Sequence, residues 1–365
     1  MQKIIKGEKA YKNIEDILKD LGVKKYLLVC DSAFQFLSIK DYFRNINIPY
    51  VKFSDFTANP LYLDVEKGVS IFKRGECDAI VAVGGGSAID VAKCIKLFSK
   101  MDTGVNFLRQ KFFDSGIPLI ALPTTAGTGS ESTKFAVIYY EDKKQSVTHD
   151  SIIPDFAILV PSLLETLPLY QKKCTLLDAL CQGIESWWSQ NSTPESVEYS
   201  KKAVRGIIKN YRLYLSGEAN EEIMLSANFA GRAINITQTT AAHAMSYKIT
   251  SLFSLPHGHA VAICLPYIWE YMISHQEKCI DPRGSNYLAN VFLDIAKVLN
   301  CSTPQKGVEF LRLMLSQLGI FSPKVTDTQL DILTASVNPE RLRNNPVELD
   351  NQTIRNLYAN IRKQE

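Results

Sequence analysis

Short runs of apolar residues recur along the first 160 positions of the chain, and an amphipathic stretch separates each run from the next. The runs at 26–30, 79–83 and 119–122 are four or five residues long and almost entirely apolar. The stretches at 64–73 and 88–98 have the spacing of apolar residues that is typical of helices. Continuous apolar strands that alternate with helices predict a parallel sheet that is covered on both faces.

The pattern changes near Pro161. Before it, 50–53 and 156–160 also have the composition of strands, and 135–140 with 146–149 has the pattern of a hairpin. After it, strand patterns disappear and long helical patterns follow, interrupted by prolines. We therefore expect two domains, an α/β domain over 1–160 and an all-helical domain over 161–365.

The composition is that of a globular protein and restricts its partners. Apolar residues make up 46% of the chain and charged residues 22%, and the net charge of +3 is too small to favour nucleic acid or an anionic membrane as a partner. No run of apolar residues is long enough to span a bilayer, and the N-terminus lacks the apolar core of a secretory signal. The eight cysteines are scattered without a CxxC pair, so we expect reduced thiols and a cytoplasmic protein.

Two glycine-rich loops follow successive predicted strands. Gly84, Gly85 and Gly86 allow close backbone approach, and Ser87 opens a helix whose N-terminus can bind a pyrophosphate. This turn alone is equally compatible with a plain strand-to-helix connection. A second loop at 123–131 (PTTAGTGSE) follows the next strand, and the two loops together predict a nucleotide site. The chain has no GxxxxGK[ST] element, so an ATP or GTP P-loop is not expected.

Asp31 follows the first predicted strand and bears on the choice of coenzyme. A carboxylate at this position can accept hydrogen bonds from ribose hydroxyls and repel a 2′-phosphate, which favours NADH over NADPH. The alternative is a helix cap in the DSAF turn. The predicted coenzyme-binding residues are Asp31, Gly84, Gly85, Gly86, Ser87, Asp90, Lys93, Thr124, Thr125, Thr128 and Ser130.

A second set of polar residues has the chemistry of a metal site. Asp178 and Gln182 are four residues apart in a helical pattern, so both project from one helix face. His243 and His257 lie further along, close to His259. A carboxylate and two imidazoles can hold a divalent iron or zinc ion, although each histidine alone is more often a packing residue.

Several motifs occur in the order found in one enzyme family. They are GGGSAIDVAK (84–93), TTAGTGSE (124–131), DALCQGIES (178–186), HAMSYKITSLFSLPHGHAVAICLP (243–266) and NPERLRNNP (338–346). On these segments the chain resembles the iron-containing (group III) alcohol dehydrogenases over almost its whole length. The resemblance implies the dehydroquinate synthase-like fold, with a Rossmann-like N-terminal domain and an all-helical C-terminal domain. It also implies an NAD(P) coenzyme, a homodimer, and a divalent metal with ligands at Asp178, Gln182, His243 and His257.

The chain departs from the family pattern at two positions. Gln182 stands where the family has histidine, and a carboxamide oxygen is a weaker donor to a transition metal than imidazole. Three options follow, namely a weakened site with Gln182 or water as the fourth ligand, recruitment of His259, or a site without metal. Tyr247 stands where the family often has a proton-relaying histidine, and a phenol suits proton donation to a nascent alkoxide. We therefore predict catalytic roles for Tyr247 and His259 in an aldehyde reductase.

The predicted substrate is a small anionic aldehyde. Basic residues near the predicted site, Lys134, Arg232 and Lys248, would favour an anion, unless they are solvated surface charges. The segments 179–196 and 234–251 resemble the phosphonoacetaldehyde reductases, which form 2-hydroxyethylphosphonate. Alternatives are a general short-chain alcohol dehydrogenase or semialdehyde reductase, a dehydroquinate synthase-like lyase that uses NAD, and a nucleotide-binding protein without catalysis.

Overall fold

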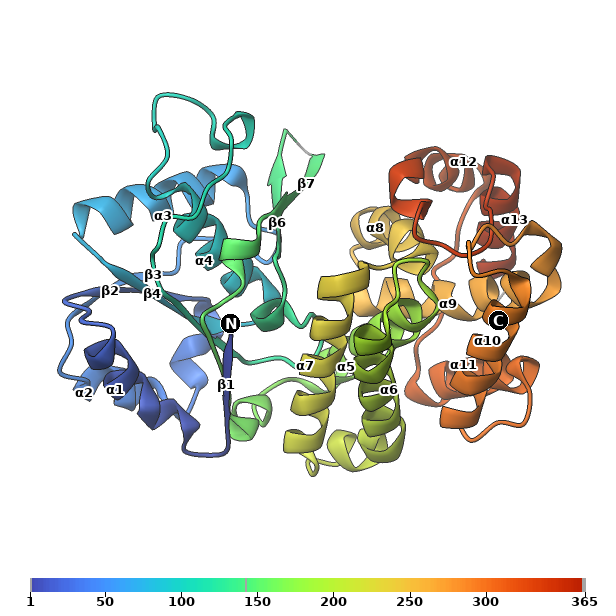
Figure 1. Ribbon diagram of the computed structural model, residues 1–365, viewed down its shortest axis with the longest axis horizontal. Helices are drawn as coiled ribbons and strands as arrows, with labels where there is room; N and C mark the ends of the chain where they lie inside the picture. Colours follow the sequence, from blue (N-terminus) through green and yellow to red (C-terminus); the bar gives the residue numbers. More distant parts are fainter. Residues whose placement is uncertain (1, 142, 363–365) are drawn as a thin grey trace. The chain divides into compact units, whose positions relative to one another are not determined.

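The structure, a computed structural model, describes residues 2–141 and 143–362. The chain divides into two compact units, Met1–Leu167 and Pro168–Glu365. Each unit has its own architecture, which Figure 1 shows with the elements labelled. The first unit contains the sheet, and the second is built from helices.

A six-stranded parallel sheet forms the centre of the described part of the first unit. In spatial order its strands are β1 (Lys3–Lys6), β8 (Phe156–Leu159), β5 (Leu119–Pro123), β4 (Ala79–Gly84), β2 (Tyr26–Cys30) and β3 (Tyr50–Phe53). The hairpin of β6 (Phe135–Tyr140) and β7 (Lys143–Thr148) forms a separate two-stranded sheet. The predicted parallel sheet and the predicted hairpin are confirmed.

Helices cover both faces of this sheet, as Figure 1 shows. The helices are α1 (Asn13–Asp20), α2 (Lys40–Asn45), α3 (Tyr62–Arg74) and α4 (Gly86–Phe98). Successive residues of a strand point to opposite faces, so Leu27 packs in the cluster with α3 and α4, whereas Leu28 packs with α1 and α2. Every residue of β2 and β4 is therefore buried, which explains why these strands are continuous apolar runs in the sequence.

The order of the strands creates a switch point between β2 and β4. From β2 the chain goes to β3 on one side and then crosses to β4 on the other side of β2. In open α/β sheets, ligands bind beyond the carboxyl ends of the strands at such a point. Asp31 follows β2, and Gly85 follows β4, so these residues lie where a nucleotide site is expected.

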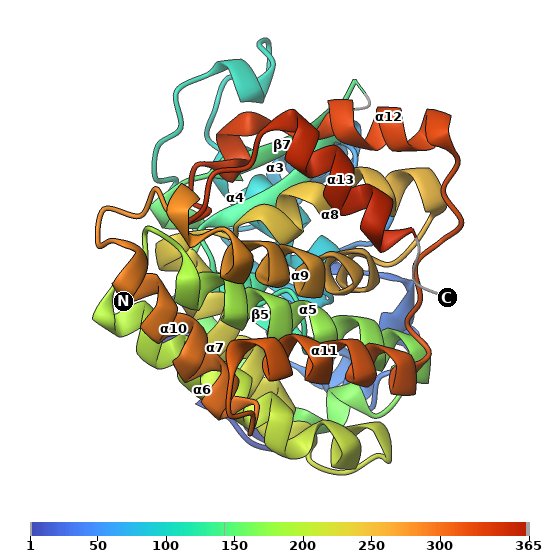
Figure 2. The ribbon, with the colours of Figure 1, turned by 90° about the vertical axis from the view of Figure 1, so that its right-hand side faces the viewer.

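The second unit contains helices and no strand among its described residues, as predicted. They are α5 (Leu169–Trp188), α6 (Pro194–Leu215), α7 (Asn220–Thr237), α8 (Ala241–Phe253), α9 (His257–Ser274), α10 (Ser285–Val298), α11 (Pro304–Leu318), α12 (Asp327–Ser336) and α13 (Asn351–Ile361). Figure 2 shows α9 in the middle of this unit, where it packs against α5, α8, α11 and α13. No helix in the described ranges is both long and apolar enough to cross a membrane.

Candidate functional site

Three helices of the second unit bring together three of the four predicted metal ligands. Asp178 comes from the middle of α5, His243 from the first turn of α8, and His257 is the first residue of α9. One donor atom of each lies within 4.8 Å of the other two. Asp178 Oδ1 lies 3.4 Å from His243 Nε2 and 4.0 Å from His257 Nε2. Asp178 and His243 are buried, whereas the His257 side chain is 34% exposed, so the cluster is reachable from one side.

The buried donor atoms of this cluster fit a metal ion. Asp178 Oδ1 and His243 Nε2 are buried and make no hydrogen bond with any described residue. Buried polar atoms are nearly always paired, so two such atoms that face each other point to a partner of another kind. One carboxylate oxygen and two imidazole nitrogens form a donor set that suits Fe²⁺ or Zn²⁺.

Gly258 makes the close approach of α9 to α5 possible. A Cβ atom on Gly258 would lie 1.9 Å from the carbonyl oxygen of Cys174 and 2.9 Å from the Cβ atom of Asp178. Only a residue without a side chain fits there. Since His257 directly precedes Gly258, this contact sets the position of His257 beside Asp178.

Gln182 lies beside the cluster, one turn after Asp178 on α5. Its side chain is buried, and it is one of the neighbours that lower the pKa of the Asp178 carboxyl. Gln182 therefore contributes to the electrostatic surroundings of Asp178. Whether Gln182 also binds a metal stays a prediction.

Glu185, which the sequence analysis did not select, holds His243 in place. Its fully buried carboxylate accepts hydrogen bonds from His243 Nδ1, from the Thr240 hydroxyl at 2.8 Å and from the Ala242 N–H at 3.0 Å. The carboxylate thus binds the N-terminal end of α8, where a negative charge is favourable, and directs His243 Nε2 toward Asp178. The spacing could have indicated it, because Glu185 lies two turns after Asp178 on the same helix.

The carboxylates on both sides of His243 control its protonation. Burial disfavours the charged ring, but the Glu185 and Asp178 carboxylates outweigh burial and raise the pKa of His243 to about 10. Burial likewise tends to raise the pKa of Asp178, but the neighbouring His243 and His257 outweigh it, and the pKa is lowered. A ligating nitrogen must be unprotonated, so a metal ion would displace a proton from His243.

The two predicted catalytic residues differ in their surroundings. The ring of Tyr247 stacks on His257, with 5.5 Å between centroids and 4° between planes, so Tyr247 lies beside the cluster. His259 is buried, and its Nδ1 and Nε2 atoms each lie 2.8 Å from a partner, the Tyr170 hydroxyl and the Phe321 carbonyl oxygen respectively. Burial also lowers the pKa of His259. The structure thus brings Tyr247 to the cluster and gives His259 partners outside it, and both catalytic roles stay predictions.

The three predicted substrate-binding residues differ in their contacts. Arg232 on α7 stacks on the ring of Tyr199 and donates a hydrogen bond to its hydroxyl. Lys134, in the first unit, forms an ion pair with Asp150 at 3.1 Å. Lys248 is half-buried on α8, directly after Tyr247. Within the second unit, Lys248 thus adjoins Tyr247, whose ring stacks on His257.

The two glycine-rich loops of the first unit lie in contact. The N–H of Thr124 donates to the carbonyl of Gly84 at 3.0 Å, and a Cβ atom on Gly86 would lie 2.8 Å from the Thr128 side chain. The helix α4 begins at Gly86, so the unpaired N–H groups of its first turn start at the junction of the loops. Asp31 accepts a hydrogen bond from the Ala33 N–H and so caps the short helix that follows it. This is the helix cap that was expected as the alternative to a ribose-binding role. Its Oδ2 atom would also lie 3.0 Å from a Cβ on Gly84.

Ser130 links Lys93 and Asp90 through hydrogen bonds. The buried Lys93 ammonium donates to Ser130 Oγ at 3.0 Å, Thr133 Oγ1 at 3.0 Å and the Phe135 carbonyl at 2.7 Å. Ser130 Oγ in turn donates to Asp90 at 2.6 Å. Burial lowers the pKa of Lys93 to about 8. These contacts fix the second loop onto α4, so these residues would affect a coenzyme through the position of that loop.

Comparison with known proteins identifies the family. The model of the iron-containing alcohol dehydrogenase family matches residues 1–161, and the model of the C-terminal part of the same family matches residues 173–361. The chain is 30% identical over 339 residues to an alcohol dehydrogenase of Thermococcus barophilus, which covers 87% of this chain and 86% of that protein. It is 31% identical over 312 residues to a phosphonoacetaldehyde reductase of Streptomyces viridochromogenes, which covers 77% and 75% respectively.

A solved structure shows the same fold. The iron-containing alcohol dehydrogenase of Thermococcus thioreducens superposes with a TM-score of 0.89 at 26% identity and covers 100% of this chain and 99% of its own. With the family models, this likeness confirms the expected Rossmann-like and helical architecture. The chain therefore belongs to the iron-containing alcohol dehydrogenase family and is an oxidoreductase of alcohols and aldehydes.

Proposed function

We propose that this protein uses NADH to reduce a small anionic aldehyde to the primary alcohol, and that phosphonoacetaldehyde is the substrate and 2-hydroxyethylphosphonate the product. The observation that carries the proposal is the cluster of Asp178, His243 and His257 with the Tyr247 ring stacked on it. Such a cluster can hold a metal that polarises a carbonyl, and the stacked tyrosine has a hydroxyl that can donate a proton. The similarity to a phosphonoacetaldehyde reductase supports the choice of aldehyde.

Each residue of the cluster has a role in this reaction. Asp178, His243 and His257 would hold a divalent Fe²⁺ or Zn²⁺ ion, with Gln182 or water as a fourth ligand. When bound, this ion supplies Lewis-acid stabilisation of the charge that develops on the carbonyl oxygen, of the order of several kcal/mol. Tyr247 would donate a proton to that oxygen as the alcohol forms.

The first unit would hold the coenzyme, which supplies the hydride. The N–H groups at the start of α4 would bind the pyrophosphate, and the loop at 124–131 would form the second side of the nucleotide site. Asp31 would accept hydrogen bonds from the ribose hydroxyls. Its carboxylate would repel the 2′-phosphate of NADPH, so we expect a preference for NADH.

The coenzyme preference has a direct test at Asp31. We use Asp31→Ser because serine can still accept from the Ala33 N–H and so keeps the cap. In the variant, the ratio of kcat/KM with NADH to kcat/KM with NADPH should fall at least about tenfold. A change of this size is expected when one charge-assisted hydrogen bond is lost. An unchanged ratio of kcat/KM values for the two coenzymes would show that Asp31 acts only as the cap.

The cell compartment and the assembly state are also part of the proposal. Cys30, Cys77, Cys94 and the chain's other cysteines are all free thiols, and most are buried, which suits the reducing cytoplasm. We propose a cytoplasmic enzyme. A homodimer follows from the family resemblance and can be checked by light scattering.

The proposed activity is tested by NADH oxidation with a set of aldehydes. Metal-stripped protein and protein reconstituted with Fe²⁺ or Zn²⁺ are given phosphonoacetaldehyde, succinic semialdehyde and glycolaldehyde in parallel. We expect reconstituted protein to have a kcat/KM for phosphonoacetaldehyde at least about tenfold above that for the uncharged glycolaldehyde. Equal values would contradict an anionic substrate and favour a general short-chain alcohol dehydrogenase. The similarly related Thermococcus barophilus protein is named as an alcohol dehydrogenase.

A further inference from the structure

The motif at 338–346 (NPERLRNNP) has no role in the site described so far. It forms the connection between α12 and α13, and its first part folds into a short 3-10 helix, η8 (Pro339–Leu342). This helix packs against α8, which carries His243 and Tyr247. The segment 338–346, called here the arginine loop, contains Arg341 and Arg343.

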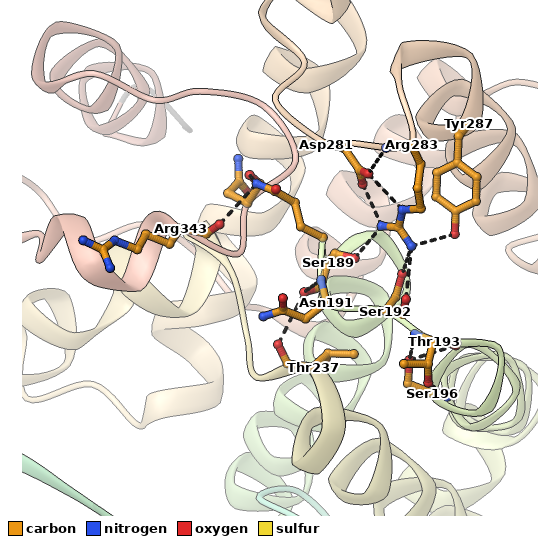
Figure 3. Close-up of polar contacts among 12 residues, drawn as sticks. Ser189, Asn191, Ser192, Thr193, Ser196, Thr237, Asp281, Arg283, Tyr287 and Arg343 are labelled. Atoms are coloured by element: carbon orange, nitrogen blue, oxygen red, sulfur yellow. Dashed lines mark hydrogen bonds and ion pairs between the residues drawn. The ribbon is translucent and has the colours of Figure 1, made fainter.

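The C-terminal half of the arginine loop is tied to the end of α5. The side-chain amide of Gln190 donates to the carbonyl oxygens of Arg343 at 3.1 Å and Asn345 at 2.7 Å. The amide of Asn191 donates to the Asn344 side chain at 2.7 Å. Figure 3 shows Arg343 with its guanidinium directed away from Ser189 and Asn191 at the end of α5. The backbone of the loop is therefore fixed by residues that follow the metal-ligating helix.

The end of α5 is itself held rigidly. Arg283 donates to the carbonyl of Ser189 at 2.9 Å and to the hydroxyl of Ser192 at 2.7 Å, and it pairs with the buried Asp281. Figure 3 shows Arg283 between Asp281 and these serines. The residues that bind the arginine loop are thus connected through Arg283 to Asp281, which is buried inside the helical unit.

In the arginine loop, the Arg341 guanidinium lies over the ring of Tyr247. The guanidinium carbon lies 4.5 Å from the Tyr247 ring centroid, and the same ring stacks on His257. A single aromatic ring therefore connects Arg341 to a candidate metal ligand. A guanidinium over an aromatic ring keeps its five N–H donors, which can still bind an anion.

Arg341 and Arg343 differ in their charge partners. Within the described residues, the Arg341 guanidinium has no recorded ion pair or hydrogen bond, and the residue is only half exposed. Arg343, two positions later, is exposed and forms an ion pair with Glu340 at 2.6 Å. A half-buried guanidinium beside the proposed reaction centre, with its N–H groups not committed to a carboxylate, has the chemistry of an anion-binding group.

We propose that Arg341 binds the anionic group of the aldehyde and makes the enzyme selective for anionic substrates. This inference rests on the proposed function, and it assigns the selectivity to the arginine loop instead of to Lys134, Arg232 or Lys248. The ligand class is an aldehyde that carries a phosphonate, sulfonate or carboxylate group. The carbonyl is directed to the metal cluster, and the anion lies against the guanidinium.

The test compares Arg341→Gln with Arg343→Gln in the full-length, metal-loaded protein. Arg341→Gln should lower kcat/KM for phosphonoacetaldehyde by about 10- to 100-fold, as expected for the loss of charge-assisted hydrogen bonds. It should change kcat/KM for glycolaldehyde by less than about threefold. Arg343→Gln should leave both values close to those of the wild type. Arg341→Lys should fall between wild type and Arg341→Gln, because it keeps the charge and loses the planar fork.

A binding measurement separates recognition from catalysis. Ethylphosphonate, which has no carbonyl, should inhibit wild type competitively, and its inhibition constant should rise at least about tenfold in Arg341→Gln. A thermal melt of each variant confirms that it is folded.

The outcomes distinguish this inference from the proposed function. An equal loss for phosphonoacetaldehyde and glycolaldehyde would mean that Arg341 acts through Tyr247, and it would overturn the assignment. A wild-type enzyme that prefers anionic aldehydes, with the preference intact in Arg341→Gln, would overturn only the role of Arg341. A wild-type enzyme without that preference would overturn both.

Discussion

At the scale of a single side chain, Gln182 is the position where the candidate metal site departs from the family pattern. It lies on the same face of α5 as Asp178 and is one of the neighbours that lower the pKa of the Asp178 carboxyl. In the family pattern an imidazole stands here and ligates the metal. The carboxamide is a weaker donor, so this centre should hold its metal less tightly than a centre with three histidines.

Restoring the histidine tests this account. Gln182→His should raise the affinity for Zn²⁺ by at least about tenfold, because an imidazole nitrogen joins the ligands. Competition with a chromophoric chelator measures this affinity. Gln171→His, on an exposed position of the same helix, is the control and should leave the affinity unchanged. An unchanged affinity in Gln182→His would mean that position 182 does not face the metal.

Glu185 acts on the same centre through His243. Glu185→Gln keeps the size of the side chain but removes the charge that orients the imidazole and binds the start of α8. We expect the affinity for Zn²⁺ to fall by about 10- to 100-fold, the usual cost of losing such a partner. Metal content after dialysis against a weak chelator measures it. Glu195→Gln, on an exposed position of α6, is the control, and an equal metal content in both variants would contradict the role of Glu185.

The contact between α5 and α9 is the feature that assembles the centre at the scale of elements. Gly258→Ala would place a methyl group 1.9 Å from the Cys174 carbonyl oxygen, a backbone atom that cannot rotate away. The helices must move apart, at a cost of at least about 1–3 kcal/mol in the free energy of unfolding. Since His257 moves with α9, metal affinity should fall as well. In the control Gly104→Ala the new methyl group would meet only the Asp102 side chain, at 3.3 Å. If Gly258→Ala had the same melting temperature and metal affinity as the wild type, this account would be contradicted.

In the first unit, the hydrogen bonds between α4 and the second glycine-rich loop hold the proposed nucleotide site together, as the α5–α9 contact does for the metal ligands. Lys93→Met removes three hydrogen bonds, one to Ser130 in the loop and two to Thr133 and Phe135 directly after it. We expect a lower melting temperature and an NADH dissociation constant raised at least about tenfold, as the loop loses its fixed position. Lys96→Met is a matched control, because Lys96 is also buried on α4 but pairs with Asp155. It should lower stability and leave NADH binding unchanged. Equal NADH binding in the two variants would show that Lys93 does not act on the nucleotide site.

Most of the sheet could be predicted from the sequence because most of its strands are buried on both faces. Such strands are continuous apolar runs, and 26–30 and 79–83 were recognised as such. The strand β1 was missed because it is short, lies at the edge of the sheet and is mostly exposed. Its KIIK sequence therefore lacks the apolar run by which the other strands were found.

The site was predictable only in part, for a different physical reason. The donor types at Asp178, His243 and His257 could be recognised in the motifs, and the structure brings them together. The roles of Glu185 and Arg341 depend on contacts with residues dozens of positions away, with His243 and Tyr247. Such contacts are set by how the helices pack, and a single sequence contains no periodic signal for them.

At the scale of the whole molecule, the proposed reaction needs both units, since the nucleotide loops belong to one and the metal cluster to the other. The most direct test of the central claim is ³¹P NMR of the metal-loaded protein with NADH and phosphonoacetaldehyde. We expect the substrate signal to be replaced by that of 2-hydroxyethylphosphonate, with one NADH oxidised per molecule formed and a much slower reaction after the metal is removed. If the protein oxidises NADH with glycolaldehyde but leaves the phosphonoacetaldehyde signal unchanged, the proposed function is wrong.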